Sequence, residues 1–236
     1  MALPKLEHPT FVLNLPSNNE KITLRPFLVK EEKILLMAMQ SEDTEEIINS
    51  IKQVIGNCIV NGNIIIDDLA TIDIEYIFIK LRARSVNNII KLTYRDNEDD
   101  KKYDVEVNLD EVEIKTNKDH SNNIKISEKI GLTLKYPKAS ITSATKNVTS
   151  EAELFFEILK NSLDTIYDEN NVYKVSDSTE EELNDFIQSL DVRAFNKIQD
   201  FFTTMPRLHY EVSYVNSLNN KRTIVLNSLS DFFTLG

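Results

Sequence analysis

The stretch from Leu24 to Met39 reads LRPFLVKEEKILLMAM and joins an extended opening to the first predicted helix. Pro26 marks the boundary, because its ring fixes φ and removes a backbone donor. Residues 30–33 then give a charged first turn, and residues 34–39 are continuously apolar. A helix that is apolar on every side must be covered by the rest of the chain. We therefore expect this helix to be buried and the other elements to be organised around it.

The residues before this stretch predict an arm followed by a hairpin. Residues 1–9 carry two prolines and no periodicity, which is typical of an extended arm. Alternating apolar residues at 11–15 and 21–27, with the turn signal Ser-Asn-Asn-Glu between them, predict two short strands. Such arms often order against a partner, although simple fraying is the alternative. The arm supplies three candidate partner contacts, Pro4, Leu6 and Pro9.

Two more helices are predicted before residue 86. The first begins with a capping box at Asp43 and Glu46 and carries an apolar stripe that ends at Cys58 and Ile59. We interpret Cys58 as a core residue rather than a reactive thiol, because no His or Lys lies at helical spacing to lower its pKa. The second helix, over 73–84, is apolar on most sides. Arg82 and Arg84 suit its C-terminal dipole and are also candidate partner contacts.

The apolar period changes to two near residue 90, which indicates strands. Residues 90–94 and 103–109 flank the polar run from Arg95 to Lys102 and predict a long hairpin with a charged tip. Further short strands up to residue 136 should complete one antiparallel sheet, with the three helices covering a face. Residues 137–149 are rich in Ser, Thr and Lys and predict a linker or long loop.

The remainder of the chain alternates between helices and hairpins. Helix starts are predicted at Ser150 with Glu153, at Ser178 with Glu181, and at Asp191. Hairpins are predicted over 166–175 and 208–226, and a short helix over 228–233 closes the sequence. Its Phe232 and Phe233 are candidate partner contacts, since aromatic anchors carry much of the energy of many interfaces. Docking of this helix on the protein itself is the alternative.

Together these elements predict the α+β class. We expect N-terminal helices packed on an antiparallel sheet of hairpins, with a smaller C-terminal helix-hairpin module. The predicted division is an N-terminal α+β domain over 1–136 with the arm at 1–9, a linker or long loop over 137–149, and a C-terminal α+β module over 150–236.

Charge and cysteine content restrict the kinds of partner and compartment. The 236 residues carry a formal net charge of −11, which disfavours binding to nucleic acid and to anionic membranes. Cys58 is the only cysteine, so no internal disulfide can form, as expected in a reducing compartment. The sequence shows no secretion signal and no apolar run near the ~20 residues that span a bilayer. We therefore expect a soluble protein that is cytoplasmic where it is made.

No motif indicates catalysis or a bound group. His8, His120 and His209 lie at no metal-ligand spacing, and no zinc, phosphate-loop or nucleophile-elbow motif occurs. With 38 acidic residues, a pair of nearby carboxylates would arise by chance and carries no information. We predict no enzyme activity, no cofactor and no metal. Composition and spacing alone do not indicate a function.

Several ordered runs are more distinctive than the composition. They are LPKLEHPTF at 3–11, LRPFLVKEEK at 24–33, YIFIKLRARSV at 76–86, FFTTMP at 201–206, the 210–222 hairpin and LSDFF at 229–233. These runs resemble the baseplate hub protein family of T-even-type contractile-tailed phages, and the resemblance covers most of the chain. It implies a structural or assembly role that helps to build the baseplate hub around the central spike, with other hub and spike proteins as partners and no catalysis.

The same resemblance implies a location in the host cytoplasm during assembly, and the virion tail baseplate if the protein is retained there. Some relatives carry cysteines where Arg95 to Lys102 stands here, so no metal site at this tip carries over. Two other functions are left open: a transient assembly chaperone of the hub that is absent from the mature particle, and an acidic host-directed protein-binding module.

Overall fold

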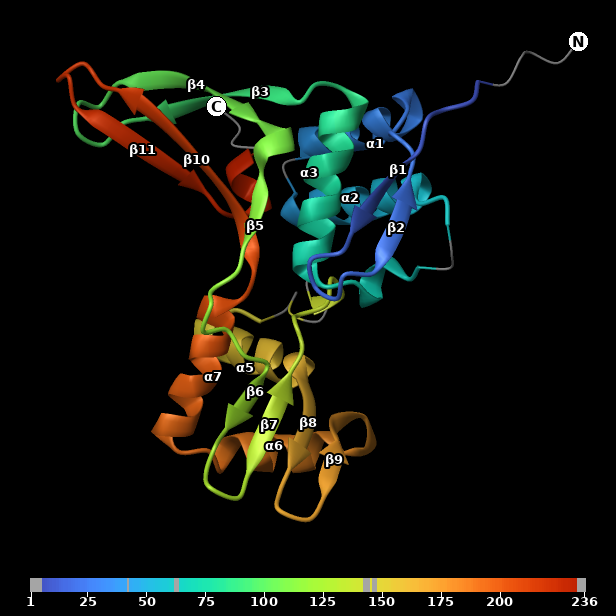
Figure 1. Ribbon diagram of the computed structural model, residues 1–236, viewed down its shortest axis with the longest axis vertical. Coiled ribbons are helices and arrows are strands. Elements are labelled where there is room, and N and C mark those ends of the chain that lie inside the picture. The colour runs from blue at the N-terminus through green and yellow to red at the C-terminus, as the bar shows by residue number, and fades with distance from the viewer. Residues whose placement is uncertain (1–5, 42, 62–63, 142–144, 146–147, 233–236) are drawn as a thin grey trace, which may run out of the picture. The chain divides into compact units, whose positions relative to one another are not determined.

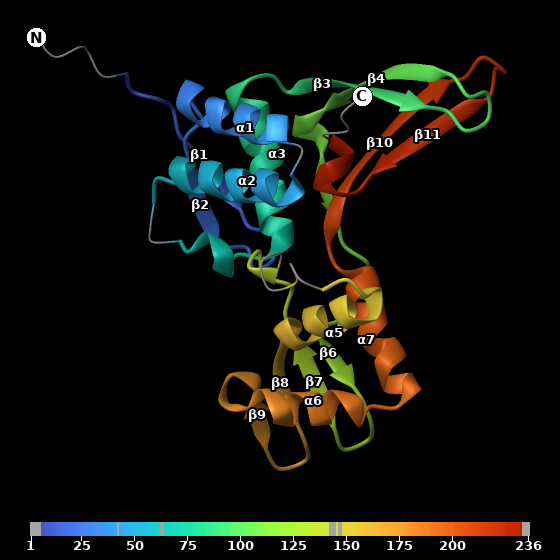
Figure 2. The ribbon, with the colours of Figure 1, turned by 180° about the vertical axis from the view of Figure 1, so that it is seen from behind.

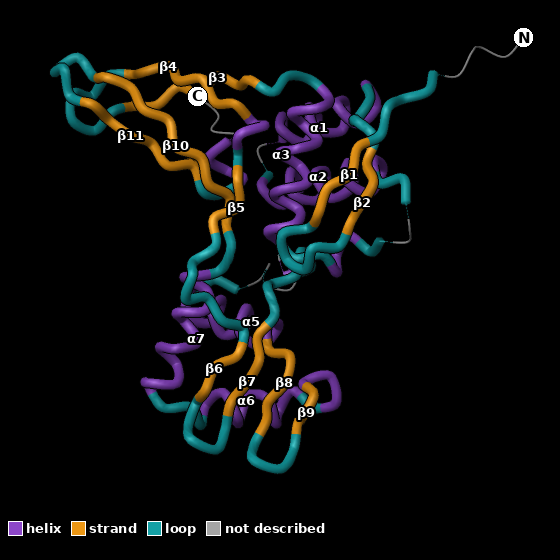
Figure 3. The backbone as a smooth tube through the Cα atoms, in the orientation of Figure 1, coloured by secondary structure: helices purple, strands orange, loops and turns teal. Residues whose placement is uncertain are grey.

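The computed structural model describes residues 6–41, 43–61, 64–141, 145 and 148–232. The described residues form six α-helices and eleven β-strands, and every strand pair among them is antiparallel. This confirms the α+β class. Figure 3 colours the helices and strands along the chain. The strands are divided among four separate sheets, so the single sheet expected up to residue 136 is wrong.

The chain divides into two compact units. Unit 1 comprises Met1–Lys115 and Arg207–Gly236, and unit 2 is the continuous segment Thr116–Pro206. This division differs from the expected boundaries at residues 136 and 150. The physical reason is a long-range strand pair, because Leu208 in the last part of the chain pairs with Ile114 and so returns that part to unit 1.

The first half of unit 1 is a hairpin packed with three helices (Figure 1). Ser17 at the hairpin turn donates from its N–H and its hydroxyl to the Asp73 carboxylate, at 2.9 and 2.6 Å, and so fixes the turn to the third helix. Cys58 is fully buried, and burial raises the pKa of its thiol to about 11, which confirms it as a core residue. The elements are β1 (Phe11–Asn14), β2 (Lys21–Leu24), α1 (Val29–Ser41), α2 (Thr44–Cys58), the 3₁₀ helix η1 (Ile66–Asp68) and α3 (Thr71–Ser85).

Helix α1 is not covered on every side, so that expectation is wrong. It lies beside α2 in both views of the ribbon, and only Glu31 and Ala38 are buried on it (Figures 1 and 2). Leu36 and Met37 remain 55% and 59% exposed. The inward face is narrow and includes a charge: the Glu31 carboxylate lies 3.0 Å from the Arg25 guanidinium and accepts a hydrogen bond from the Leu28 N–H at 2.9 Å.

The second half of unit 1 consists of two long hairpins and a short strand that pairs with one of them. One sheet contains β3 and β4, and the other has the order β11-β10-β5. Lys80 of α3 donates to the carbonyls of Leu109, Asp110 and Val112, which fixes the segment between β4 and β5 against the helix. The elements are β3 (Ile89–Arg95), β4 (Lys102–Asn108), η2 (Leu109–Glu111), β5 (Glu113–Lys115), β10 (Arg207–Val215), β11 (Lys221–Leu226) and η4 (Leu229–Phe232).

Unit 2 is a four-stranded sheet, in the order β6-β7-β8-β9, packed with three helices. Its buried core includes Leu132, Leu159, Leu163, Ile198 and Phe201. The elements are β6 (Asn123–Lys125), β7 (Gly131–Leu134), α5 (Glu151–Ser162), β8 (Leu163–Tyr167), β9 (Val172–Lys174), η3 (Val175–Asp177), α6 (Glu180–Gln188) and α7 (Val192–Thr204). No helix in the described part of the chain is long and apolar enough to cross a membrane.

The helix caps of unit 2 agree only in part with the sequence prediction. Asp191 caps α7 by accepting from the Ala194 N–H at 2.7 Å, as expected. The capping box of α6 is formed by Thr179 and Glu182, one residue later than predicted. Ser150 precedes α5, but its side chain makes no capping hydrogen bond.

Candidate functional site: the linked hairpin tips

The tips of the β3–β4 and β10–β11 hairpins are tight turns that share two features. In each turn the N–H of the first residue donates to a carbonyl a few positions ahead. Asp96 donates to the Lys101 carbonyl at 2.8 Å, and Asn216 donates to the Asn220 carbonyl at 3.0 Å. Each turn also contains one residue with positive φ, Asp100 at 59° and Asn219 at 64°. Asn and Asp tolerate this left-handed region better than other non-glycine residues. The sequence of each tip therefore favours a tight turn with a left-handed residue near its end.

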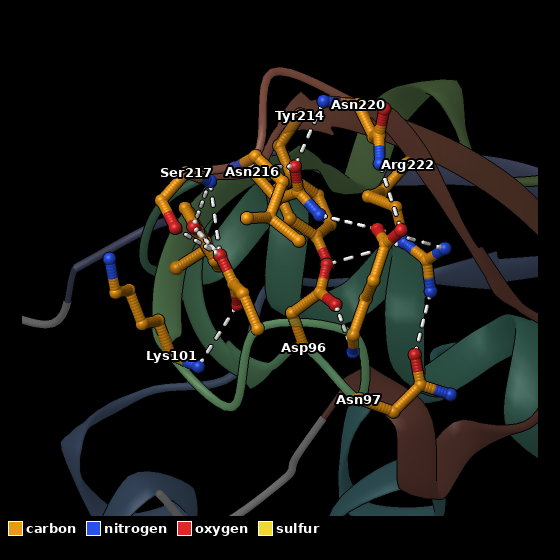
Figure 4. A network of polar contacts seen from close by, with 12 residues as sticks. Asp96, Asn97, Lys101, Tyr214, Asn216, Ser217, Asn220 and Arg222 are labelled. Atoms are coloured by element: carbon orange, nitrogen blue, oxygen red, sulfur yellow. Dashed lines mark hydrogen bonds and ion pairs between the residues drawn. The ribbon is translucent and has the colours of Figure 1, made fainter.

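Three carboxylates of the β3–β4 tip accept hydrogen bonds from the β10–β11 tip (Figure 4). Asp96 accepts from the Tyr214 hydroxyl. Glu98 accepts from the side-chain amides of Asn216 and Asn220, at 2.6 and 2.8 Å. The two tips lie about 118 residues apart in the sequence and are complementary, with acceptors on one and donors on the other.

A third carboxylate and an arginine complete the network. Asp99 accepts from the N–H and the hydroxyl of Ser217, at 3.0 and 2.8 Å. Arg222 donates to the Asn97 side-chain oxygen at 2.6 Å, and its Nε lies 3.3 Å from Asp96 Oδ2 (Figure 4). We call this set the tip network: Asp96, Asn97, Glu98, Asp99, Tyr103, Tyr214, Asn216, Ser217, Asn220 and Arg222.

Two carboxylates of the tip network, Asp96 and Asp99, have lowered pKa values. The hydrogen bond from Tyr214, opposed by burial, lowers the pKa of Asp96. Burial opposes ionisation of Asp99 as well, but hydrogen bonds from Tyr103 and Ser217 outweigh it and lower its pKa. Burial and the hydrogen bond to Asp96 raise the pKa of Tyr214 to about 12. The pKa values of Asp96 and Asp99 are lowered because these carboxylates accept hydrogen bonds. None of the three shifts brings a pKa close to 7, where a group could transfer protons efficiently.

The tip network therefore fixes how the two hairpins are arranged. Tyr214 packs between the hairpins, with ring centroids 4.8 Å from Tyr103 and 6.2 Å from Tyr94. The two hairpins are therefore joined at their tips and by these rings. No group of three or more His, Cys, Asp or Glu side chains in the described residues is placed to hold a metal ion.

The predicted contact residues have different environments. Pro4 and Phe233 lie outside the described residues, whereas Leu6 and Pro9 are exposed. Phe232 is only 2% exposed, because η4 docks on the protein itself, so this candidate contact is corrected to a core residue.

The two arginines of α3 also differ. Arg82 is partly buried, and burial lowers its pKa while the Glu32 carboxylate opposes that change. Arg84 is exposed and lies over the Phe11 ring, with 4.8 Å between the guanidinium carbon and the ring centroid.

Two features of the surface were not predicted. The tip network joins residues about 118 positions apart, and no local pattern reports such a contact. The only available signals were the polar turn residues on both hairpins. The exposed side of α1 was missed because the apolar run 34–39 predicted burial on all sides, whereas Glu31 of the charged first turn is one of the two buried residues.

Comparison with known proteins identifies the family. Residues 8–234 match the family described as T4 bacteriophage base plate protein. Neither the curated proteins nor the solved structures contain a match. The matched region covers unit 2, unit 1 except its two ends, the tip network and all the described candidate contacts except Leu6. The chain therefore belongs to the T4 bacteriophage base plate protein family, which gives it a structural or assembly role in a phage baseplate.

Proposed function

We propose that the protein is a baseplate hub component that acts through protein–protein contacts around the central spike. The family match over residues 8–234 supports this proposal more than any other observation. Linked hairpins and exposed apolar side chains suit an assembly subunit, since binding surfaces rather than a reactive centre carry its function. We place the protein in the host cytoplasm during assembly and then in the tail.

The exposed side of α1 is the first surface that such contacts would use. Val29, Leu36 and Met37 are all more than half exposed. Residues seven and eight positions apart on a helix lie on the same face, so these three side chains form one apolar strip. An apolar helix face laid into a groove of the partner is a common mode of recognition. The strip is therefore the surface to change first.

The experiment complements an infection by a phage lacking this gene with the wild-type protein or with a variant. Leu36→Ser combined with Met37→Ser should leave the melting temperature unchanged and reduce recovery of the protein with baseplate proteins. Val225→Ser, at another exposed apolar position of unit 1, is the matched control. Quantitative mass spectrometry of purified tails reports the amount retained. Absence of the wild-type protein from assembly intermediates as well as from tails would contradict a role in the hub.

The same measurement tests the chaperone alternative. A structural subunit should be present in intact tails at a fixed ratio to other hub proteins. A transient chaperone should be found with hub proteins in assembling lysates and be missing from purified tails. The acidic host-directed alternative predicts host proteins as partners at low salt and their loss at high salt, because screening weakens exposed charge pairs.

A further inference from the structure

The outer edge of β1 is an open strand edge. Leu15 N–H donates to Glu20 O at 2.8 Å, in the same register as the pairs Phe11↔Leu24 and Leu13↔Ile22. Hydrogen-bonded pairs alternate along an antiparallel ladder, so the N–H and C=O groups of Val12 and Asn14 point away from β2. No described residue hydrogen-bonds to these groups of Val12 or Asn14, and Val12 is 57% exposed.

The opposite edge of the same hairpin is covered. Thr23 N–H donates to the Asn61 side chain at 2.6 Å, and Thr23 O accepts from the Val60 N–H at 2.9 Å. The chain that follows α2 therefore pairs with β2, and only the β1 side can accept another strand.

The edge of β1 has one of the usual protections, its short length of four residues, but not the commonest one. Exposed sheet edges in native proteins carry charged side chains that discourage pairing with other chains. Among the described edge strands, β3, β4, β5, β6, β9 and β11 each contain at least one Lys, Arg, Asp or Glu. Strand β1, with the sequence FVLN, contains none. Among these edges, β1 is thus the one without a charged side chain that would oppose pairing.

A cation lies at the first residue of the same strand. The Arg84 guanidinium is exposed and stacks on the Phe11 ring. No ion pair joins Arg84 to a carboxylate of a described residue, although the chain carries 38 acidic residues. An exposed guanidinium held by an aromatic ring is preorganised for a carboxylate.

Building on the proposed baseplate role, we infer that the outer edge of β1 receives an extended segment of another baseplate protein by strand addition, and that a carboxylate of this segment pairs with Arg84. Main-chain hydrogen bonds to Val12 and Asn14 supply affinity, and the charge pair fixes the register. A second copy of this chain fits less well. Two β1 edges paired about a two-fold axis would bring no carboxylate to Arg84, because β1 contains none.

The test uses single substitutions that change pairing at the β1 edge without removing a hydrogen bond of the hairpin itself. Val12→Pro removes the outward N–H without removing a hydrogen bond of the hairpin, and proline is accepted on edge strands. Val12→Thr is its control. Arg84→Glu reverses the charge, and Arg84→Lys keeps it. Each variant replaces the wild type in the infection assay described above, and its melting temperature is measured in the purified full-length protein.

We expect Val12→Pro and Arg84→Glu to reduce incorporation into tails by about tenfold, the effect of losing roughly 1.4 kcal/mol of binding free energy. Val12→Thr should match the wild type, and Arg84→Lys should be intermediate. Wild-type incorporation of a folded Val12→Pro variant, or of Arg84→Glu if the proline variant unfolds, would overturn the inference. If the wild type itself enters neither tails nor intermediates, the proposed function fails and this inference fails with it.

A photocrosslinking residue at position 12 identifies the occupant. The expected product joins position 12 to an extended segment of another baseplate protein that contains Asp or Glu within a few residues of the crosslink. A product that joins two copies of this chain would overturn the assigned occupant, and so would a crosslink to a helix. The same residue at position 225 is the control, since Val225 is exposed on a strand that bears charges.

Discussion

At the scale of single residues, the ion pair between Arg25 and Glu31 connects the first hairpin with α1. Glu31 is fully buried, and the Arg25 side chain is 16% exposed. Removing one partner of a buried pair leaves the other charge uncompensated. We expect Glu31→Ala to lower the free energy of unfolding by about 3–5 kcal/mol in urea titrations followed by circular dichroism.

Two comparisons test this explanation. Glu32→Ala, at the exposed neighbouring position, should cost less than about 0.5 kcal/mol. Replacing Arg25 by Met and Glu31 by Leu together should cost less than Glu31→Ala alone, because no buried charge is left behind. Equal losses for Glu31→Ala and Glu32→Ala would show that the pair contributes nothing.

Glu75 makes the stability of unit 1 depend on pH near neutrality. Burial raises its pKa to about 7; the Leu229 N–H opposes the rise and the Asp231 carboxylate adds to it. The folded chain therefore holds a proton that the unfolded chain releases. The free energy of unfolding should fall as pH rises from about 5 to 7 and then level off with respect to this group.

The substitution Glu75→Gln mimics the protonated carboxyl at every pH. We expect its melting temperature to match that of the wild type at pH 5 and to exceed it at pH 8. Differential scanning calorimetry across this range provides the measurement. A wild-type profile that rises between pH 5 and pH 8 relative to the variant would contradict the assigned pKa direction.

At the scale of elements, the tip network determines whether the two long hairpins move together. Glu98 accepts from both Asn216 and Asn220, so Glu98→Ala removes two cross-tip hydrogen bonds at once. We expect amide hydrogen exchange over residues 216–220 to become at least about fivefold faster, the effect of losing roughly 1 kcal/mol. Exchange over 163–174 in unit 2 should not change. Glu106→Ala, on the exposed part of β4, is the matched variant.

Local chemistry predicted most elements and several of their ends. The turn at 17–20, the hairpin tip at 95–102 and the hairpin over 208–226 were predicted, and each contains an Asn or Asp with φ near 60°. Asp191 was correctly predicted to cap α7. Such features depend on residues only a few positions apart, so they can be predicted from the local sequence.

Features that depend on distant residues were not accessible in this way. The apolar run in α1 suggested burial on all sides, but the Arg25 pair turns Glu31 inward and leaves Leu36 outside. No sequence pattern indicated that Lys80 of α3 donates to three carbonyls near η2. In both cases a buried polar contact, which has no apolar period, decides the orientation.

At the scale of the whole molecule, unit 2 is a continuous segment with its own core. It contains a four-stranded sheet and three helices, and its buried residues include Leu132 and Leu159. We expect residues 116–206, expressed alone, to melt cooperatively and to bury these residues as they do in the full chain. Leu159→Asp should abolish that transition, because it places an unpaired charge in the core. A disordered spectrum for the wild-type segment would refute its independence.

The pairing of β5 with β10 also sets an order of events during synthesis. Ile114 emerges from the ribosome before all of unit 2, whereas its partner Leu208 emerges after it. At bacterial translation rates of about 5–20 residues per second, this interval lasts on the order of 5–18 s. During that time the nascent β3–β4 hairpin has no β10 to pack against. Unit 2 is thus the first unit that can finish folding, although its synthesis begins after residues 1–115 have been made. Unit 1 can be completed only when residues 207–236 have emerged.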